Sequence, residues 1–295
     1  MWTREFNDFV APARARPQVW RLLLGILAVA VVYAAGIVAV IALVWATAGG
    51  AAISAWMQSI ALADSPTAVL LMLATFAGML AGAVAAARLL HFRGAGTLFG
   101  RGTLRHFTVA AVIAAAVFGA SMVLLPAPFE VVRNTPLDLF LSFLPLALIA
   151  LLIQTGAEEV LFRGYLQQQL AARFDHWLVW LVLPSVFFGL LHYDPTTAGA
   201  NAWWMVAAAT AFGLCAADLT RVTGSIGAAW GVHFVNNAIA ILIVALEGSL
   251  SGLSLWTTPF TATDTETLRP LIIQDILISV IVWAAIRLWL ARSGK

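Results

Sequence analysis

Eight stretches of this 295-residue chain are apolar over roughly the length that a helix needs to cross a lipid bilayer. A hydrocarbon core takes about 20 helical residues, or about 17–25 when the helix is tilted or the bilayer adapts. The predicted spans are residues 20–46, 68–87, 107–125, 137–153 with a continuation beyond, 177–192, 202–219, 225–246 and 271–290. The pattern predicts an all-α membrane protein, a bundle of eight transmembrane helices.

Composition supports a membrane protein and excludes most soluble classes. Apolar residues make up 62% of the chain and charged residues 10%, against about 45–50% and about 25% in soluble domains. A water-soluble fold of this size could not bury so much apolar surface. The formal net charge is only +2, so we expect the lipid bilayer, and not nucleic acid, as a partner. A single cysteine, Cys215, excludes an intrachain disulfide framework and a cysteine-based metal cluster.

Basic residues predict the orientation of the chain. With eight spans and the N-terminus inside, all but two of the 16 basic residues fall on the inner side, the exceptions being Arg133 and Arg269. Such asymmetry is what the positive-inside bias produces. We therefore expect an integral protein of the cytoplasmic (inner) membrane with both termini in the cytoplasm.

The chain divides into four parts along this pattern. Residues 1–19 mix aromatic side chains with arginines and predict an interfacial N-terminal segment. Residues 20–136 hold the first three spans, 137–247 the next four, and 248–295 an outer loop, the eighth span and the C-terminus. Gly78 and Gly82 predict close packing of the second span against a neighbouring helix of the same chain.

Ionisable residues follow the apolar run of the fourth span. Glu158 and Glu159 are adjacent, and Arg163 lies four residues after Glu159, at the spacing of a helical ion pair. Adjacent helical side chains point about 100° apart, so Glu158 has no local counter-charge and is a candidate general base. Taken alone, the pair also fits a charged helix end in water.

The positions of two histidines favour a buried site instead. A turn centred near Asp175 places Glu158 and His192 at equal separations along the chain, roughly 25 Å from the turn at about 1.5 Å per residue. The fourth helix then runs to about Phe174, and its residues 167–169 project into headgroups or cytosol. His233 and Asn237 share one face of the seventh span, about 15 and 21 Å from their own turn.

These four groups could support water attack on an amide. A carboxylate beside a histidine can deprotonate water, and a second histidine with an amide can donate hydrogen bonds to an oxyanion. Zinc held by Glu158, His192 and His233 is the alternative. The chain lacks the G-x-S-x-G elbow of serine hydrolases and the H-E-x-x-H helix of metalloproteases. We therefore favour chemistry with no cofactor.

At these residues the chain resembles the CAAX protease and bacteriocin-processing (CPBP, or Abi) family of intramembrane proteases, which includes the eukaryotic CAAX prenyl endopeptidase. The family pattern E-E-x-x-x-R matches Glu158, Glu159 and Arg163. Its F-x-x-x-H matches Phe188 and His192, and its H-x-x-x-N matches His233 and Asn237. The likeness covers roughly residues 137–247, a CPBP-like catalytic core.

The resemblance implies a role for each of these residues. Glu158 would activate water with help from His192, while His233 and Asn237 would form an oxyanion hole. Glu159 and Arg163 would hold the site in shape. It also implies a conical intramembrane cavity open toward the cytoplasm, and a peptide or membrane-protein substrate, lipidated in some relatives.

Two other functions remain open from the sequence. A protein of the same fold could act as a membrane scaffold or immunity protein without proteolysis. A small-solute transporter would also use buried Glu and His, but the two halves show no repeat symmetry or paired broken helices.

Overall fold

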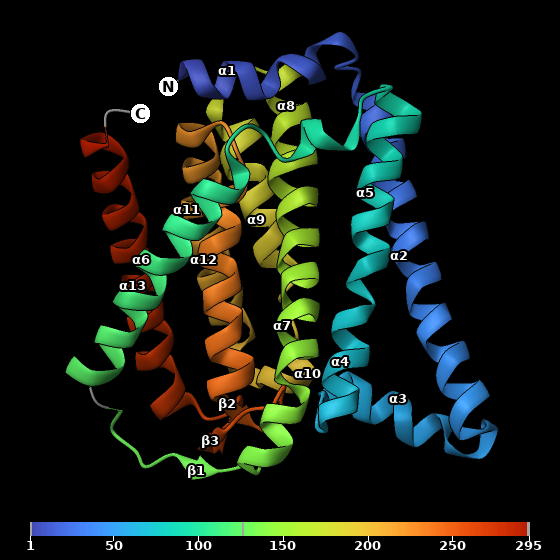
Figure 1. Cartoon of the computed structure of the whole chain (residues 1–295), viewed down its shortest axis with the longest axis vertical. Coiled ribbons are helices and arrows are strands. Elements are labelled where there is room, and N and C mark those ends of the chain that lie inside the picture. The colour runs from blue at the N-terminus through green and yellow to red at the C-terminus, as the bar shows by residue number, and fades with distance from the viewer. Residues whose placement is uncertain (1, 126, 294–295) are drawn as a thin grey trace.

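The computed structural model describes residues 2–125 and 127–293, and it is mostly helical (Figure 1). The α-helices, in chain order, are α1 (Arg4–Val10), α2 (Val19–Ala48), α3 (Ile53–Leu62), α4 (Pro66–Ala74), α5 (Phe76–His91), α6 (Thr103–Leu124), α7 (Leu137–Glu159), α8 (Gln168–Arg173), α9 (Leu183–Leu190), α10 (Pro195–Ala198), α11 (Ala202–Thr223), α12 (Gly227–Ala238) and α13 (Thr265–Arg292). Shorter 3-10 helices are Ala11–Ala15, Gly50–Ala52, Ala95–Leu98 and Gly199–Asn201. Three π-helical segments, Val160–Gln167, Leu178–Val182 and Ile239–Ile243, adjoin α7, α9 and α12.

The helices make the chain an integral membrane protein. Among the described residues, six helical stretches are long and apolar enough to cross a membrane: Val19–Ala48, Pro66–His91, Thr103–Leu124, Leu137–Arg173, Pro195–Thr223 and Thr265–Arg292. Two shorter apolar helices, Leu178–Leu190 and Gly227–Ile243, stand where the fifth and seventh spans were predicted. A count of eight crossings stays a prediction, because Leu178–Leu190 is shorter than a hydrocarbon core requires and Gly227–Ile243 is at the lower limit. The predicted extension of the fourth helix is confirmed, since it ends at Arg173.

A small sheet closes one end of the bundle, which differs from the purely helical prediction (Figure 1). Its strands are β1 (Val132–Arg133), β2 (Val244–Glu247) and β3 (Trp256–Thr261), in the order β1-β3-β2. β3 pairs antiparallel with β1 and parallel with β2. The strands lie in the connections between helices and are only two to six residues long, so hydropathy did not indicate them.

Helix α1 lies across the opposite end of the bundle (Figure 1). Phe6 and Phe9 are buried, and the Phe6 ring lies 4.9 Å from the Trp180 ring. The Thr3 hydroxyl accepts a hydrogen bond from Phe6 N (3.0 Å) and donates one to the carbonyl of Arg221 (2.9 Å). These two aromatic side chains therefore pack on the protein, and the segment forms a cap on the helix ends. Its position at the membrane interface stays a prediction.

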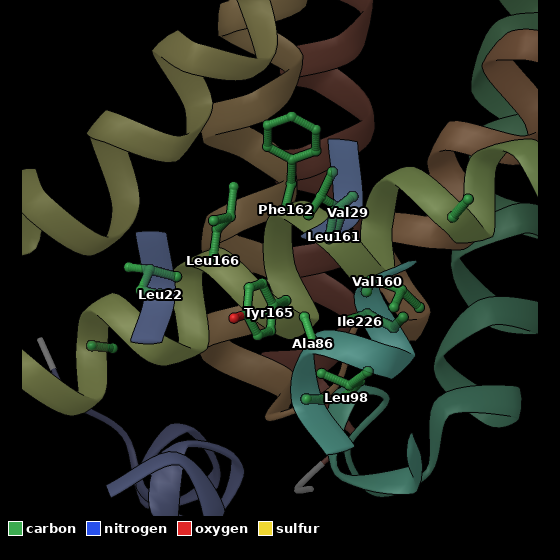
Figure 2. Close-up of a cluster of buried hydrophobic side chains, with 14 of the residues drawn as sticks. Leu22, Val29, Ala86, Leu98, Val160, Leu161, Phe162, Tyr165, Leu166 and Ile226 are labelled. Atoms are coloured by element: carbon green, nitrogen blue, oxygen red, sulfur yellow. The ribbon is translucent and has the colours of Figure 1, made fainter. Parts of the chain in front are cut away.

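Close packing of α2 on α5 sets one side of the bundle. A Cβ at Gly82 would lie 2.9 Å from Cα of Val29, and one at Gly78 would lie 3.0 Å from the carbonyl oxygen of Val32. These contacts confirm that the two glycines serve packing within the chain. Figure 2 shows the adjoining core, where Val29 from α2 gathers with Tyr165 and its neighbours from the π-helical segment Val160–Gln167.

The polar end of the fourth helix is enclosed, contrary to the expectation of exposed glutamines. Gln167, Gln168 and Gln169 are all buried. Their amide nitrogens donate to the carbonyls of Ala217 (3.0 Å), Phe9 (2.5 Å) and Arg16 (3.3 Å), respectively. The expectation was wrong because the N-terminal cap covers this helix end and supplies two of the three acceptors.

Candidate active site

Glu159 is the fully buried centre of a charged cluster. Its Oε1 accepts from Arg163 Nη1 at 3.0 Å, which confirms the predicted ion pair, and lies 2.8 Å from Nδ1 of His233. Arg163 also donates from Nη2 to the carbonyl of Gly213 on α11 (3.2 Å). Since a buried charge needs both a counter-charge and hydrogen bonds, this arrangement fixes α7, α11 and α12 around one point.

Glu158 faces the other side of the same imidazole. Its Oε2 lies 3.3 Å from Nε2 of His233 and accepts from Gln154 Nε2 at 2.8 Å. The Glu158 side chain is 12% exposed, whereas Glu159 is 0% exposed. One histidine therefore bridges two adjacent carboxylates, and only Glu158 has access to the outside.

Gln154 is a site residue that the sequence analysis missed. It lies one helical turn before Glu158, and its Oε1 accepts from Asn237 Nδ2 at 2.9 Å. Because an ionised carboxylate only accepts hydrogen bonds, Gln154 must turn its nitrogen to Glu158 and its oxygen to Asn237. The spacing of four residues between Gln154 and Glu158 was the available signal, since such pairs face each other on a helix.

His192 lies apart from this hydrogen-bonded group. It is exposed in the turn after α9, and its Nδ1 is paired with the carbonyl of Phe188 (2.9 Å). Within the described residues it makes no hydrogen bond to Glu158, Glu159, His233 or Asn237. Phe188 is buried, with its ring 4.9 Å from the Arg163 guanidinium and edge-on to His233 at 6.0 Å.

Close helix contacts hold these side chains in position. A Cβ at Gly156 would lie 2.8 Å from Cζ2 of Trp230, and the Trp230 indole donates to the Thr155 hydroxyl at 3.1 Å. On the other side, a Cβ at Gly213 would lie 3.1 Å from Ser185. α7 can therefore approach α12, and α11 can approach α9, closely enough for side chains from different helices to meet.

The alternative zinc site needs Glu158, His192 and His233 to converge on one ion. In residues 2–125 and 127–293, no three His, Cys, Asp or Glu side chains are grouped as they would be around a metal. His233 already turns one nitrogen to each glutamate, and Nδ1 of His192 faces a backbone carbonyl. As arranged, these residues do not fit a three-ligand zinc site.

The conical cavity that was predicted around these residues stays a prediction. A hollow of about 530 Å³ opens elsewhere, under the N-terminal cap. Glu5, Asp8, Thr97 and Arg101 are among its lining residues, and the predicted catalytic residues are not.

Comparisons with known proteins agree with the motif resemblance. Residues 140–239 match a family model described as "Type II CAAX prenyl endopeptidase Rce1-like", a range that contains every predicted site residue. An uncharacterized protein of Bacillus subtilis (strain 168), YyaK, is 32% identical over 113 residues, which are 38% of this chain and 38% of that relative. No solved structure matches the chain. The likeness to that family is therefore shown for residues 140–239.

Proposed function

We propose that this protein is an intramembrane endopeptidase in which Glu158 activates the attacking water. The observation that carries the proposal is the pairing of Glu158 with His233, at 3.3 Å, beside a buried Glu159–Arg163 ion pair. An acid at membrane depth is expensive and normally serves a function. The family match over residues 140–239 supports the same reaction class.

Glu158 has the geometry of a general base. Its Oε2 is held by Gln154 and His233, while its Oε1 makes no hydrogen bond to the described residues. The free oxygen can accept a proton from a water molecule that attacks the carbonyl carbon. The new C–O bond forms as that proton moves to Glu158, and the proton then passes to the leaving amine as the C–N bond breaks.

His233 is suited to stabilise the oxyanion. Carboxylates face both of its nitrogens, so we assign a proton to each nitrogen. Two carboxylates, one imidazolium and one guanidinium then give a neutral cluster. When Glu158 takes up the proton, its attraction for Nε2–H weakens. Nε2–H and the second Nδ2–H of Asn237 are then available to the oxyanion.

The remaining roles complete the proposal. His192 would assist Glu158 from the exposed end of α9, and Glu159 with Arg163 would hold His233 in place. The substrate would be a peptide or a membrane protein, including one with a lipidated C-terminal cysteine. The enzyme would need no cofactor and would lie in the cytoplasmic (inner) membrane with both termini in the cytoplasm.

The test compares the wild type with Glu158→Gln on a fluorogenic peptide that ends in a lipidated cysteine motif. Glu247→Gln, at an exposed strand residue, is the matched control. We expect Glu158→Gln to lose cleavage and Glu247→Gln to retain it. Equal cleavage by all three proteins would remove Glu158 from the mechanism. Full complementation by Glu158→Gln in cells would instead favour a scaffold or immunity role.

A further inference from the structure

Two arginines flank one exposed phenylalanine where α2 begins and α5 ends. The guanidinium carbon of Arg16 lies 4.2 Å from the Phe92 ring centroid, and that of Arg21 lies 5.9 Å from it. Phe92 is 66% exposed and has a φ of 54°, a conformation that residues with a Cβ seldom adopt. We call Arg16, Arg21 and Phe92 the arginine–phenylalanine cluster.

This cluster carries positive charge that the protein does not neutralise. Within the described residues, no carboxylate lies at ion-pair distance from Arg16 or Arg21. The adjoining Arg93 is buried and also lacks such a partner, and Arg21 and Arg93 both act electrostatically on His91. Because burial removes Arg93 from water, its pKa is lowered to about 10.

Several guanidinium donors in this region have no acceptor. Nε of Arg21, and Nε and Nη2 of Arg93, are buried without a hydrogen-bond partner in the part of the chain that the structure describes. Buried polar groups are nearly always hydrogen-bonded in folded proteins. Within the described residues, the positive charges of Arg21 and Arg93 therefore have no anionic partner in the protein.

The surroundings of the cluster are those of a membrane interface. Close to the cluster, the side chains of Trp20, Leu23 and Leu89 are all more than half exposed. They lie on α2 and α5, which belong to two of the helices long and apolar enough to cross a membrane. The guanidinium groups of Arg16 and Arg21 thus lie near the end of a predicted membrane-spanning helix, next to exposed apolar side chains. A lipid offers this combination of an anionic head and apolar chains.

We propose that the arginine–phenylalanine cluster is a binding site for an anionic phospholipid. The headgroup phosphate lies between the guanidinium groups of Arg16 and Arg21, which match phosphate oxygens in paired geometry. The acyl chains lie along the exposed apolar side chains of α2 and α5. The Phe92 ring lies between the lipid headgroup and the acyl chains. The site is independent of the peptidase proposal.

Binding is tested with the full chain in lipid-free nonionic detergent, titrated with phosphatidylglycerol and followed by native mass spectrometry. Arg16→Gln/Arg21→Gln removes both charges. Phe92→Gly removes the ring and suits the positive φ, so it tests the site even if the double variant does not fold. Arg101→Gln/Arg105→Gln is the matched control, since Arg105 makes a similar cation–π contact with Trp289 on the other side of the bundle.

We expect Arg16→Gln/Arg21→Gln to weaken the affinity for phosphatidylglycerol about fivefold per arginine removed. Phe92→Gly should weaken it too, and the control variant should bind like the wild type. Equal weakening in the control would show a general charge effect and overturn the proposal. Equal binding of phosphatidylcholine, or full displacement by inorganic phosphate at equal concentration, would overturn it as well.

Discussion

Gln154 and Asn237 are joined by a 2.9 Å hydrogen bond that connects the helix of the two glutamates to α12. Through its other amide atom Gln154 contacts Glu158 at 2.8 Å. The orientation of the Asn237 amide therefore depends on the Glu158 carboxylate, to which Gln154 links it through two hydrogen bonds. The proposed base and one proposed oxyanion donor are parts of one hydrogen-bonded chain.

Gln154→Leu should lower the rate of peptide cleavage with little change in KM. The substitution leaves Glu158 and Asn237 each without one partner. Loss of one such interaction in the transition state, at about 1–3 kcal/mol, corresponds to a loss of about fivefold to 150-fold in kcat. Steady-state kinetics on the lipidated peptide give both constants. Asn236→Ala, which removes only a 3.4 Å contact to Asn237, is the control. A Gln154→Leu enzyme that matches this control would exclude the orienting role.

Alanine substitutions of His192 and His233 should differ in their effects on the cleavage rate and on protein stability. His192 is exposed, and within the described residues it bonds only to its own helix end. His192→Ala should therefore lower kcat, by up to about 10²-fold if it assists proton transfer at Glu158, at an unchanged Tm. His233→Ala should lower both kcat and Tm, because it leaves two carboxylates facing a gap. Measuring Tm and kcat on each variant distinguishes the two. Full activity in His192→Ala would remove that residue from the reaction.

Hydrophobic length predicted most of the long helices, whereas the orientation that charge predicted stays a prediction. The long apolar runs required membrane helices, and the boundaries of α2, α11 and α13 agree with their predicted spans within about six residues. The strands β1 to β3 were missed because their pairing joins distant loops. The burial of Gln167–Gln169 was missed because it depends on how residues 1–19 fold back over the helix end.

Spacing along helices predicted part of the candidate site. It indicated the Glu159–Arg163 pair and the shared face of His233 and Asn237, since both depend on one helix alone. Which imidazole contacts Glu158 depends on how two helices are rotated and tilted relative to each other. Sequence spacing gives only the position of a residue along the helix axis. The structure brings His233 to both glutamates, whereas His192 lies at the exposed end of α9.

Glu159→Gln should destabilise the protein strongly. It leaves the buried Arg163 without its counter-charge, a change that typically costs about 3–5 kcal/mol. Thermal unfolding in detergent measures the loss. The double variant Glu159→Leu/Arg163→Met, which removes both charges, should lose less than Glu159→Gln alone. If the double variant is the less stable of the two, the cluster is held by packing and hydrogen bonds more than by the ion pair.

Removing metal ions should leave cleavage unchanged. The geometry of Glu158, His192 and His233 does not present three ligands to one ion, and the proposed water activation uses protein groups alone. Activity after treatment with 1,10-phenanthroline, together with elemental analysis of the purified protein, checks this. Loss of activity that zinc restores would establish the metal-dependent alternative and require the three side chains to rearrange.

Gly164→Ala should destabilise the protein, while Gly119→Ala should not. A Cβ at Gly164 would lie 2.4 Å from the backbone oxygen of Leu98, which cannot move aside as a flexible side chain can. Overpacking of this kind costs about 1–3 kcal/mol. A Cβ at Gly119, on α6, would meet nothing within 4 Å. There alanine should be neutral or stabilise the helix by about 0.5–1 kcal/mol. Thermal unfolding of the two variants side by side measures the difference. Equal stability of the two variants would mean that the segment Ala95–Leu98 does not pack closely against Gly164.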